Sequence, residues 1–254
     1  MGFFSDRYKK EVLDFIASKF DDIENIDCMR YGSYGESASD EVVNENMDNL
    51  AYQTDARWCR NGISKCVFYF DEYPDIVIKV PFEGCVKCHY DIDIPHVVED
   101  DSKRLFKNAN GKENSSDIDR LCWDYCYAEA KNYELAESLG IQNVFAATEF
   151  IGIYNRGGLD IYVYISEYIG AENEYYKNTS DGTMQMATDI LNRYDYSDMS
   201  CNILWWLIDT YGQAKADMII KFLSCNDIND LHSYNWRIDK DGNRRIIDYS
   251  SFND

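Results

Sequence analysis

Two neighbouring apolar runs constrain the fold of this chain more than any other feature. Residues 65–70 read KCVFYF, residues 76–82 read IVIKVPF, and the DEYPD between them is typical of a turn. Because β-branched and aromatic residues favour strands, the two runs predict a β-hairpin. Lys79 interrupts the second run, and an ammonium group is costly to bury unless it meets an anion. Lys79 therefore either keeps its charge in water, at a sheet edge or by extending its side chain to the surface, or contacts an anion.

Helical periodicity marks four segments of the chain. The first follows Ser5, a good N-cap residue, and the second ends on Gly140, which suits a C-cap. The acidic stretch at residues 21–57 shows no such pattern and is expected to be irregular. The predicted helices cover residues 6–20, 117–140, 184–194 and 200–225.

Further strands are expected after the second helix and at the end of the chain. Residues 144–154 and 159–170 flank the turn NRGG, and residues 235–249 form a hairpin pattern with Asp-Gly at its tip. The order predicts an α+β, two-lobed layout. We expect an N-terminal helix and acidic extension at 1–57, a strand-rich lobe at 58–168 with an insertion at about 83–118, and a reduced helical lobe at 169–254.

Charge and cysteine usage exclude several classes of partner. The formal net charge of −21 repels phosphate backbones, so direct nucleic-acid binding is not expected. The nine cysteines do not follow the spacing of a disulfide framework, and charged residues interrupt the N-terminus before a signal peptide could form. The densest apolar run, at residues 203–208, is too short to span a bilayer. These features predict a cytoplasmic protein with no membrane partner.

Three oxygen-bearing side chains surround the last predicted hairpin. Asp230 and Asn235 precede its first strand, and Asp248 follows its second strand. Two carboxylates and a carboxamide at the mouth of one hairpin form a hard oxygen site that suits Mg²⁺. A polar turn held by side-chain hydrogen bonds would use the same residue types, so this fragment alone leaves both interpretations open.

The order of these features resembles a protein-kinase-like fold. A strand lysine, a helix glutamate, a strand running into ISEYIG, a long helix and the pattern D-x4-N-x12-D follow one another over about residues 58–254. The segment DLHSYN at 230–235 is most similar to the D-L-H-x-x-N form of aminoglycoside-phosphotransferase-like kinases. The resemblance implies a strand-rich N-lobe, a minimal helical C-lobe and a phosphotransferase that uses ATP and Mg²⁺.

The resemblance also implies a role for each matching residue. Lys79 would hold the α- and β-phosphates of ATP, and Glu129 would be its ion-pair partner. Asp230 would orient the acceptor hydroxyl and take its proton. Asn235 and Asp248 would hold the metal ion.

A hinge and a phosphate-covering loop would complete the implied nucleotide site. The backbone of ISEYIG would meet the adenine ring, at Glu167, Tyr168 and Ile169. Gly62 in RNGISKCV would belong to the phosphate-covering loop, with Lys65 standing where another glycine is expected. The alternative loop is YGSYGES at 31–37, farther from the strands.

Several positions depart from the kinase-like pattern. Ile-Asn precedes Asp230 in place of His-Arg or His-Gly. Tyr249 and Ser250 follow Asp248, so the glycine of the kinase-like pattern is missing at this point. Six residues follow Asp248, without the helices that hold a peptide substrate in protein kinases. The insertion hides the spacing between Lys79 and the helix, so Glu134 is an alternative to Glu129.

These departures leave other functions open. One alternative is a pseudokinase, in which the same fold serves as a binding or regulatory module. A second is an acidic interaction protein, such as a decoy for a nucleic-acid-binding partner, because the net charge is −21. For the phosphotransferase, the acceptor is unknown and could be a protein or a small molecule.

Four cysteines form a possible zinc site. Cys85 and Cys88 lie in CVKCH, and Cys122 and Cys126 are one helical turn apart. Two such pairs can build a tetrahedral Zn²⁺ site, although ordinary buried thiols would give the same pattern. CVKCH also matches a c-type haem attachment string, which the lack of an export signal argues against.

Overall fold

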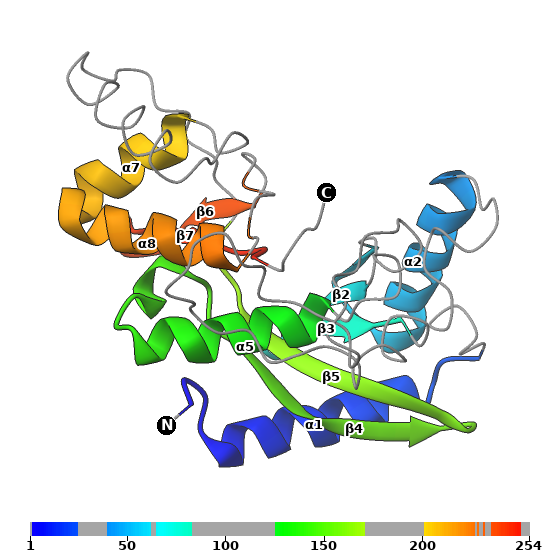
Figure 1. The fold of residues 1–254 in the computed structure, drawn as a ribbon. Coiled ribbons are helices and arrows are strands. Elements are labelled where there is room, and N and C mark those ends of the chain that lie inside the picture. Colours follow the sequence, from blue (N-terminus) through cyan, green and yellow to red (C-terminus); the bar gives the residue numbers. More distant parts are fainter. Residues whose placement is uncertain are drawn as a thin grey trace, which may run out of the picture. The chain divides into compact units, whose positions relative to one another are not determined.

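A five-stranded antiparallel sheet organises the first of the two units into which the chain divides (Figure 1). Unit 1 consists of Met1–Ile92, Ser115–Ala130 and Ala147–Tyr168, and unit 2 consists of Asp93–Asn114, Lys131–Ala146 and Ile169–Asp254. This computed structural model describes residues 2–24, 40–61, 65–82, 125–170, 201–226, 228, 231 and 235–249.

The sheet of unit 1 has the strand order β1-β2-β3-β5-β4, which places β3 at its centre. Its strands are β1 (Trp58–Asn61), β2 (Lys65–Tyr69), β3 (Ile76–Pro81), β4 (Thr148–Arg156) and β5 (Leu159–Glu167). The predicted hairpin of β2 and β3 is confirmed. The predicted pair of β4 and β5 is also confirmed, and its turn contains Gly157 and Gly158, both with positive φ.

Helix α1 (Asp6–Phe20) lies along β4 and covers one face of the sheet (Figure 1). The Ser5 hydroxyl oxygen accepts a hydrogen bond from the backbone N–H of Tyr8 at 3.3 Å, which caps the helix as predicted. The buried side chains of α1 are Val12, Ile16 and Phe20. They pack on the sheet residues Phe68, Ile78, Val80, Ile161, Val163 and Ile165 in the core of unit 1.

The prediction that residues 21–57 are irregular is wrong for the part that the structure describes. Helix α2 (Asp40–Thr54) buries Met47 and Leu50 in the same core, and the Thr54 hydroxyl donates to the Leu50 carbonyl at 2.7 Å. Acidic and amide residues surround these few apolar positions and dilute the helical pattern. Strand β1 was also not predicted, because four residues at a sheet edge carry little periodicity.

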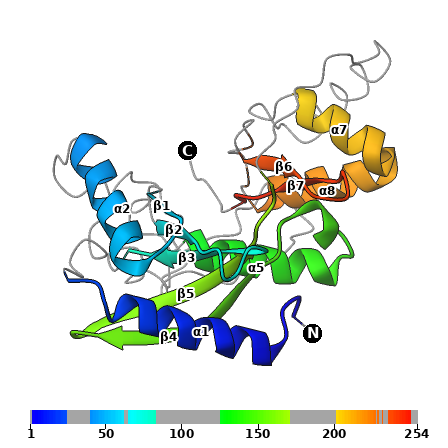
Figure 2. The same cartoon turned by 180° about the vertical axis from the view of Figure 1, so that it is seen from behind.

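Helix α5 (Tyr125–Ser138) confirms the described part of the second predicted helix, and its first turns pack on the opposite face of the sheet. Cys126 and Ala130 contact Tyr162 and Tyr164 of β5 there. The small side chains of α5 allow the helix to approach the sheet closely. Figure 2 shows α5 and the sheet from behind.

The described part of unit 2 contains the end of α5, a short 3-10 helix, two further α-helices and a short hairpin. The elements after α5 are η3 (Gln142–Val144), α7 (Cys201–Tyr211), α8 (Gln213–Cys225), β6 (Trp236–Ile238) and β7 (Arg244–Ile246). Gly212, with φ of 76°, divides the predicted helix at 200–225 into α7 and α8. The hairpin lies beside α8 in both views, and Trp236 stacks on Trp206 of α7 with ring centroids 6.1 Å apart (Figures 1 and 2).

The described residues thus form the mixed α+β structure that the sequence predicts. Within these described residues, no helix has the length and apolar character needed to cross a membrane.

Gly152 provides a test of how α1 packs on β4. A Cβ atom at this position would lie 2.5 Å from Cδ2 of Leu13, and the φ of +152° disfavours other residues. We expect Gly152→Ala to lower the free energy of unfolding by about 1–3 kcal/mol, measured by urea denaturation. In a Leu13→Ala background the same substitution should cost less, because the overlapping methyl group is gone. Strictly additive effects would contradict this packing.

Candidate functional site

Lys79 lies on the central strand of the unit 1 sheet rather than at an edge. Its partners across the strands are Val67 of β2 and Tyr164 of β5. The Lys79 side chain is 6% exposed, so its ammonium group cannot keep its charge in bulk water. Of the two interpretations that the sequence allows, contact with a carboxylate is therefore the one that the structure bears out.

Glu129 of α5 supplies that carboxylate, and it binds two lysines at once. Its side chain is fully buried, with Oε2 accepting from the Lys79 ammonium group and Oε1 accepting from Lys65 Nζ at 2.6 Å. A buried carboxylate is stabilised only when its lone pairs are satisfied by donors of opposite charge. Lys65, Lys79 and Glu129 form what we call the charge cluster of unit 1.

Strand register explains why both lysines reach the same carboxylate. Val67 of β2 is paired with Lys79 of β3, and paired residues point to the same face of a sheet. Lys65 is two residues before Val67 and therefore shares that face. Helix α5 packs on this face, so Glu129 meets both lysines.

Glu134, the alternative partner of Lys79, is not in the charge cluster. Its carboxylate binds Lys131, one turn earlier on α5, at 2.8 Å and is 63% exposed. The helix glutamate that contacts Lys79 is thus Glu129, as the kinase-like resemblance implies.

The predicted hinge lies at the end of β5. The backbone N–H of Glu167 donates to the Ala147 carbonyl, and that of Tyr168 donates to the Asp75 carbonyl, both at 2.8 Å. The ring of Tyr168 packs against Tyr69 with centroids 4.6 Å apart, whereas Ile169 begins unit 2 and is buried. An adenine ring would therefore have to use backbone groups of this segment other than these two N–H groups.

The hairpin of unit 2 brings Asn235 and Asp248 to one end. Asn235 immediately precedes β6, and Asp248 follows β7 by two positions. The backbone N–H of Ile247 donates to the Asn235 carbonyl at 2.8 Å, which aligns the two chain segments. Carboxylate and amide oxygens are ligands that Mg²⁺ accepts, so this pair could contribute to a metal site.

The residue after Asp248 is fixed by three contacts. Tyr249 is buried, its hydroxyl donates to the Ala146 carbonyl at 2.6 Å, and its ring packs on Phe145. The side-chain amide of Asn132 on α5 donates to the Tyr249 carbonyl at 2.9 Å. The backbone beside Asp248 is therefore anchored rather than freed by a glycine.

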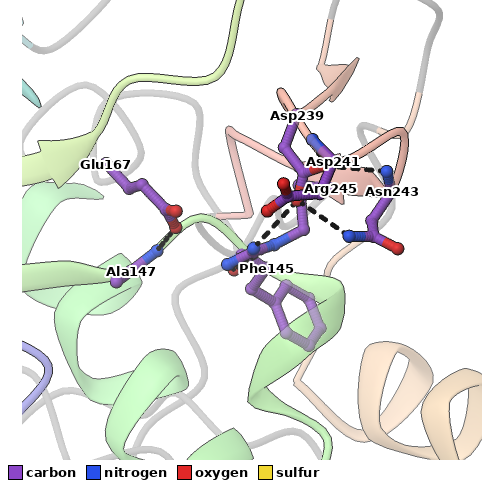
Figure 3. A network of polar contacts seen from close by, with 7 residues as sticks. All are labelled: Phe145, Ala147, Glu167, Asp239, Asp241, Asn243 and Arg245. Atoms are coloured by element: carbon purple, nitrogen blue, oxygen red, sulfur yellow. Dashed lines mark hydrogen bonds and ion pairs between the residues drawn. The ribbon is translucent and has the colours of Figure 1, made fainter. Parts of the chain in front are cut away.

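A polar network closes the same hairpin (Figure 3). Arg245 of β7 donates from Nε and Nη2 to the Phe145 carbonyl at 3.1 and 2.7 Å. The carboxylate of Asp239 accepts from the backbone N–H groups of Asn243 at 2.8 Å and Asp241 at 3.0 Å. These contacts hold strands of only three residues each in register. Separately, in unit 1, the Glu167 carboxylate accepts from the Ala147 N–H at 3.3 Å (Figure 3).

Of the predicted zinc ligands, the structure describes only Cys126, which is buried beside Ala130 and Tyr162, and the zinc site stays a prediction. The other three cysteines lie outside the described residues: Cys85, Cys88 and Cys122. Two further predicted site residues, Gly62 and Asp230, also lie outside them. In the part of the chain that the structure describes, no cluster of three or more His, Cys, Asp or Glu side chains could hold a metal ion.

Sequence reasoning missed the roles of Lys65, Asn132 and Tyr249. For Lys65 a signal existed, because a hairpin register that pairs residues 67 and 79 places Lys65 and Lys79 on one face. For Asn132 the signal is its position three residues after Glu129 on a helix. For Tyr249 the sequence shows only an aromatic residue in a polar segment.

Comparison of the chain with family models, with curated proteins and with solved structures found no match. A functional proposal for this protein therefore rests on its own residues.

The charge cluster predicts very different costs for two glutamates on one helix. Glu129→Gln removes the charge that both buried lysines share, and we expect the free energy of unfolding to fall by about 3–5 kcal/mol. Glu134→Gln is the matched control on α5, and its exposed ion pair should contribute less than about 1 kcal/mol. Urea denaturation of both variants measures the difference. Equal, small losses would contradict a shared buried carboxylate.

The Asp239 carboxylate makes the hairpin sensitive to acid. Burial by itself raises the pKa of Asp239, but hydrogen bonds from Asn243 and Asp241 and the charge of Arg245 outweigh it, so the pKa lies below its ordinary value. A lowered pKa in the folded state contributes stability above the unfolded-state pKa of about 3.9, and this contribution is lost as the pH falls through the folded-state pKa.

We therefore expect Asp239→Asn to be less stable than the wild type at pH 7, with the difference shrinking below about pH 4. Thermal unfolding across this pH range measures the effect. Asp241→Asn is the control, because only the backbone N–H of Asp241 takes part in the network. A difference that persists unchanged at low pH would contradict the electrostatic role of Asp239.

Proposed function

We propose that this protein is an ATP- and Mg²⁺-dependent phosphotransferase with a two-lobed, protein-kinase-like fold, acting on a hydroxyl group of a protein or a small molecule. The observation that carries the proposal is the buried ion pair between Lys79 of β3 and Glu129 of α5. A lysine on a central strand and a glutamate on the following helix are the pair that the kinase-like resemblance implies.

The chemistry of phosphoryl transfer suits these residue types. The acceptor hydroxyl oxygen bonds to the γ-phosphorus while the bond from that phosphorus to the bridging oxygen breaks, and ADP leaves. The hydroxyl proton passes to a carboxylate, a role that the resemblance assigns to Asp230. The reaction needs charge stabilisation and alignment rather than a covalent nucleophile.

Lys79 would provide part of that charge stabilisation. Its ammonium group donates to Glu129, which fixes the position of the nitrogen, and an ammonium group has three donors in all. The resemblance assigns a phosphate oxygen of the nucleotide to this ammonium group as a further acceptor. Because the position is fixed before the nucleotide binds, little reorganisation is needed during the reaction.

Asn235 and Asp248 would hold the metal ion. When bound, Mg²⁺ neutralises charge that develops on the β- and γ-phosphates. The contact between Ile247 and Asn235 and the anchoring of Tyr249 keep the two oxygen-bearing residues at one end of the hairpin. This donor set has the oxygen chemistry that Mg²⁺ prefers.

A second candidate is a nucleotide-binding module that does not transfer phosphate. The contacts of Tyr249 favour it, because they fix the backbone beside Asp248 where a glycine would leave it free. ATP binding without ADP formation, and without labelling of any acceptor or of the protein itself, would select this candidate.

Turnover of Mg²⁺·ATP tests the phosphotransferase proposal. We expect the wild type to form ADP in the presence of Mg²⁺, and Lys79→Met and Asp248→Asn each to lower the rate by about 10²-fold or more. A coupled ADP assay and labelling by γ-³²P-ATP measure transfer to water, to added acceptors and to the protein itself.

Lys19→Met is the control for these variants. Lys19 binds Asp55 at 3.0 Å, outside the charge cluster and the hairpin, so its loss should leave turnover unchanged. ADP formation that survives both Lys79→Met and Asp248→Asn would exclude the proposed site.

A further inference from the structure

We propose that Met47, Cys59 and Cys66 bind a soft monovalent metal ion, Cu(I), through their three sulfur atoms. Met47 lies on α2, Cys59 on β1 and Cys66 on β2, so three elements of unit 1 each supply one sulfur atom. We call these three residues the sulfur cluster. The inference does not rest on the proposed function, because the sulfur cluster shares no residue with the charge cluster or the hairpin.

The distances between the sulfur atoms suit a three-coordinate metal ion. Cys59 Sγ lies 3.6 Å from Met47 Sδ, and Cys66 Sγ lies 3.9 Å from the same atom. A hydrogen bond joins the two thiols to each other. Metal–thiolate bonds are about 2.3 Å long, so three sulfur ligands in a plane around one ion lie about 4 Å apart. The sulfur atoms therefore need to move little to hold an ion between them.

Strand register explains why the two thiols meet. Across β1 and β2, Cys59 is paired with Phe68 and Cys66 is paired with Asn61. Because side chains alternate along a strand and paired residues point to the same face, Cys59 and Cys66 are diagonal neighbours on one face. Met47 reaches both thiols from α2, which packs on β1.

The sulfur cluster lies in apolar surroundings on the face opposite to the charge cluster. Cys66 follows Lys65 in β2, and successive side chains of a strand point to opposite faces. All three residues belong to the hydrophobic core of unit 1. Cys66 is fully buried, whereas Met47 and Cys59 are 6% and 7% exposed. Since β1 is an edge strand, an ion could enter from the solvent beside Cys59.

The ligand types favour Cu(I) over the commoner metal ions. Thiolate and thioether sulfurs are soft ligands that select Cu(I), whereas Mg²⁺ and Ca²⁺ take oxygen ligands. Structural Zn²⁺ sites use four Cys or His ligands, and this cluster offers three sulfurs of which one is a thioether. The set thus differs from the groups of three or more His, Cys, Asp and Glu side chains that the described residues lack.

Binding of the ion would displace protons from the thiols. The hydrogen bond with Cys59 and burial raise the pKa of the Cys66 thiol well above its ordinary value, so Cys66 is a thiol in the metal-free protein at neutral pH. A coordinated metal ion deprotonates a thiol. Each thiol that becomes a thiolate ligand releases its proton to the solvent.

Competition with the chelator bathocuproine disulfonate measures Cu(I) binding by the full chain, without oxygen and with ascorbate as reductant. The reference protein carries Cys85→Ser and Cys88→Ser, because CVKCH offers two further thiols. We expect this reference to withdraw one equivalent of Cu(I) from the chelator. Cys59→Ala and Cys66→Ala should each weaken the affinity about 100-fold or more, since loss of a group that only supports a ligand already costs about 10- to 100-fold.

Met47→Leu in the reference protein separates binding from folding. Leucine keeps the volume of methionine without its sulfur, so the core should stay packed while the affinity for Cu(I) falls about tenfold or more. X-ray absorption at the copper edge should show three sulfur neighbours at about 2.3 Å in the reference and two in this variant. Cys225→Ala, which removes a buried thiol of α8, is the control and should bind Cu(I) as the reference does.

Each outcome decides the proposal. One equivalent of Cu(I) that all three substitutions weaken supports it. Failure of the reference to withdraw Cu(I), or binding that Met47→Leu and both alanine variants leave unchanged, would overturn it. A parallel titration with Zn²⁺ tests the choice of ion, and tighter binding of Zn²⁺ than of Cu(I) at these residues would overturn that choice. If an alanine variant does not fold, Met47→Leu and its absorption spectrum decide.

Discussion

One buried carboxylate bound to two ammonium groups is the interaction on which unit 1 depends. Glu129 is fully buried, and Lys65 and Lys79 stabilise it there from adjacent strands. This requirement fixes the register of β2 against β3, since a shift by one residue would turn one lysine to the opposite face. It also fixes the rotation of α5 over the sheet. Cys126 and Ala130, being small, let the helix come close enough for the contact.

The hairpin of unit 2 is held in a different way. Its strands have three residues each, too few to be stable as a hairpin alone. Side-chain contacts supply what the short ladder lacks: Asp239 closes the turn, Arg245 binds the Phe145 carbonyl, and Asn132 and Tyr249 anchor the chain after Asp248. Polar groups thus position the segment that carries Asn235 and Asp248. The proposed metal site requires this segment to be rigid.

The sequence predicted the elements whose patterns are strong and local. The β-branched runs, the NRGG turn and the Asp-Gly tip predicted strands β2 to β7, although not their exact ends. Helix α2 and strand β1 were missed because their apolar residues are few. Pairing across elements was harder to predict. Glu129 and Glu134 could not be separated by spacing, and the contact of Lys65 with Glu129 requires the strand register and the helix position together. Tyr249 is fixed by residues more than one hundred positions away.

The central proposal is that the charge cluster and the oxygen-bearing end of the hairpin serve a nucleotide. The most direct measurement is the melting temperature of the wild type and of Asp248→Ala during titration with ATP, with and without Mg²⁺. A ligand that binds only the folded state raises the melting temperature. The account predicts a rise in the wild type that requires Mg²⁺ and that Asp248→Ala loses. An unchanged melting temperature in the wild type at saturating Mg²⁺ and millimolar ATP would contradict it.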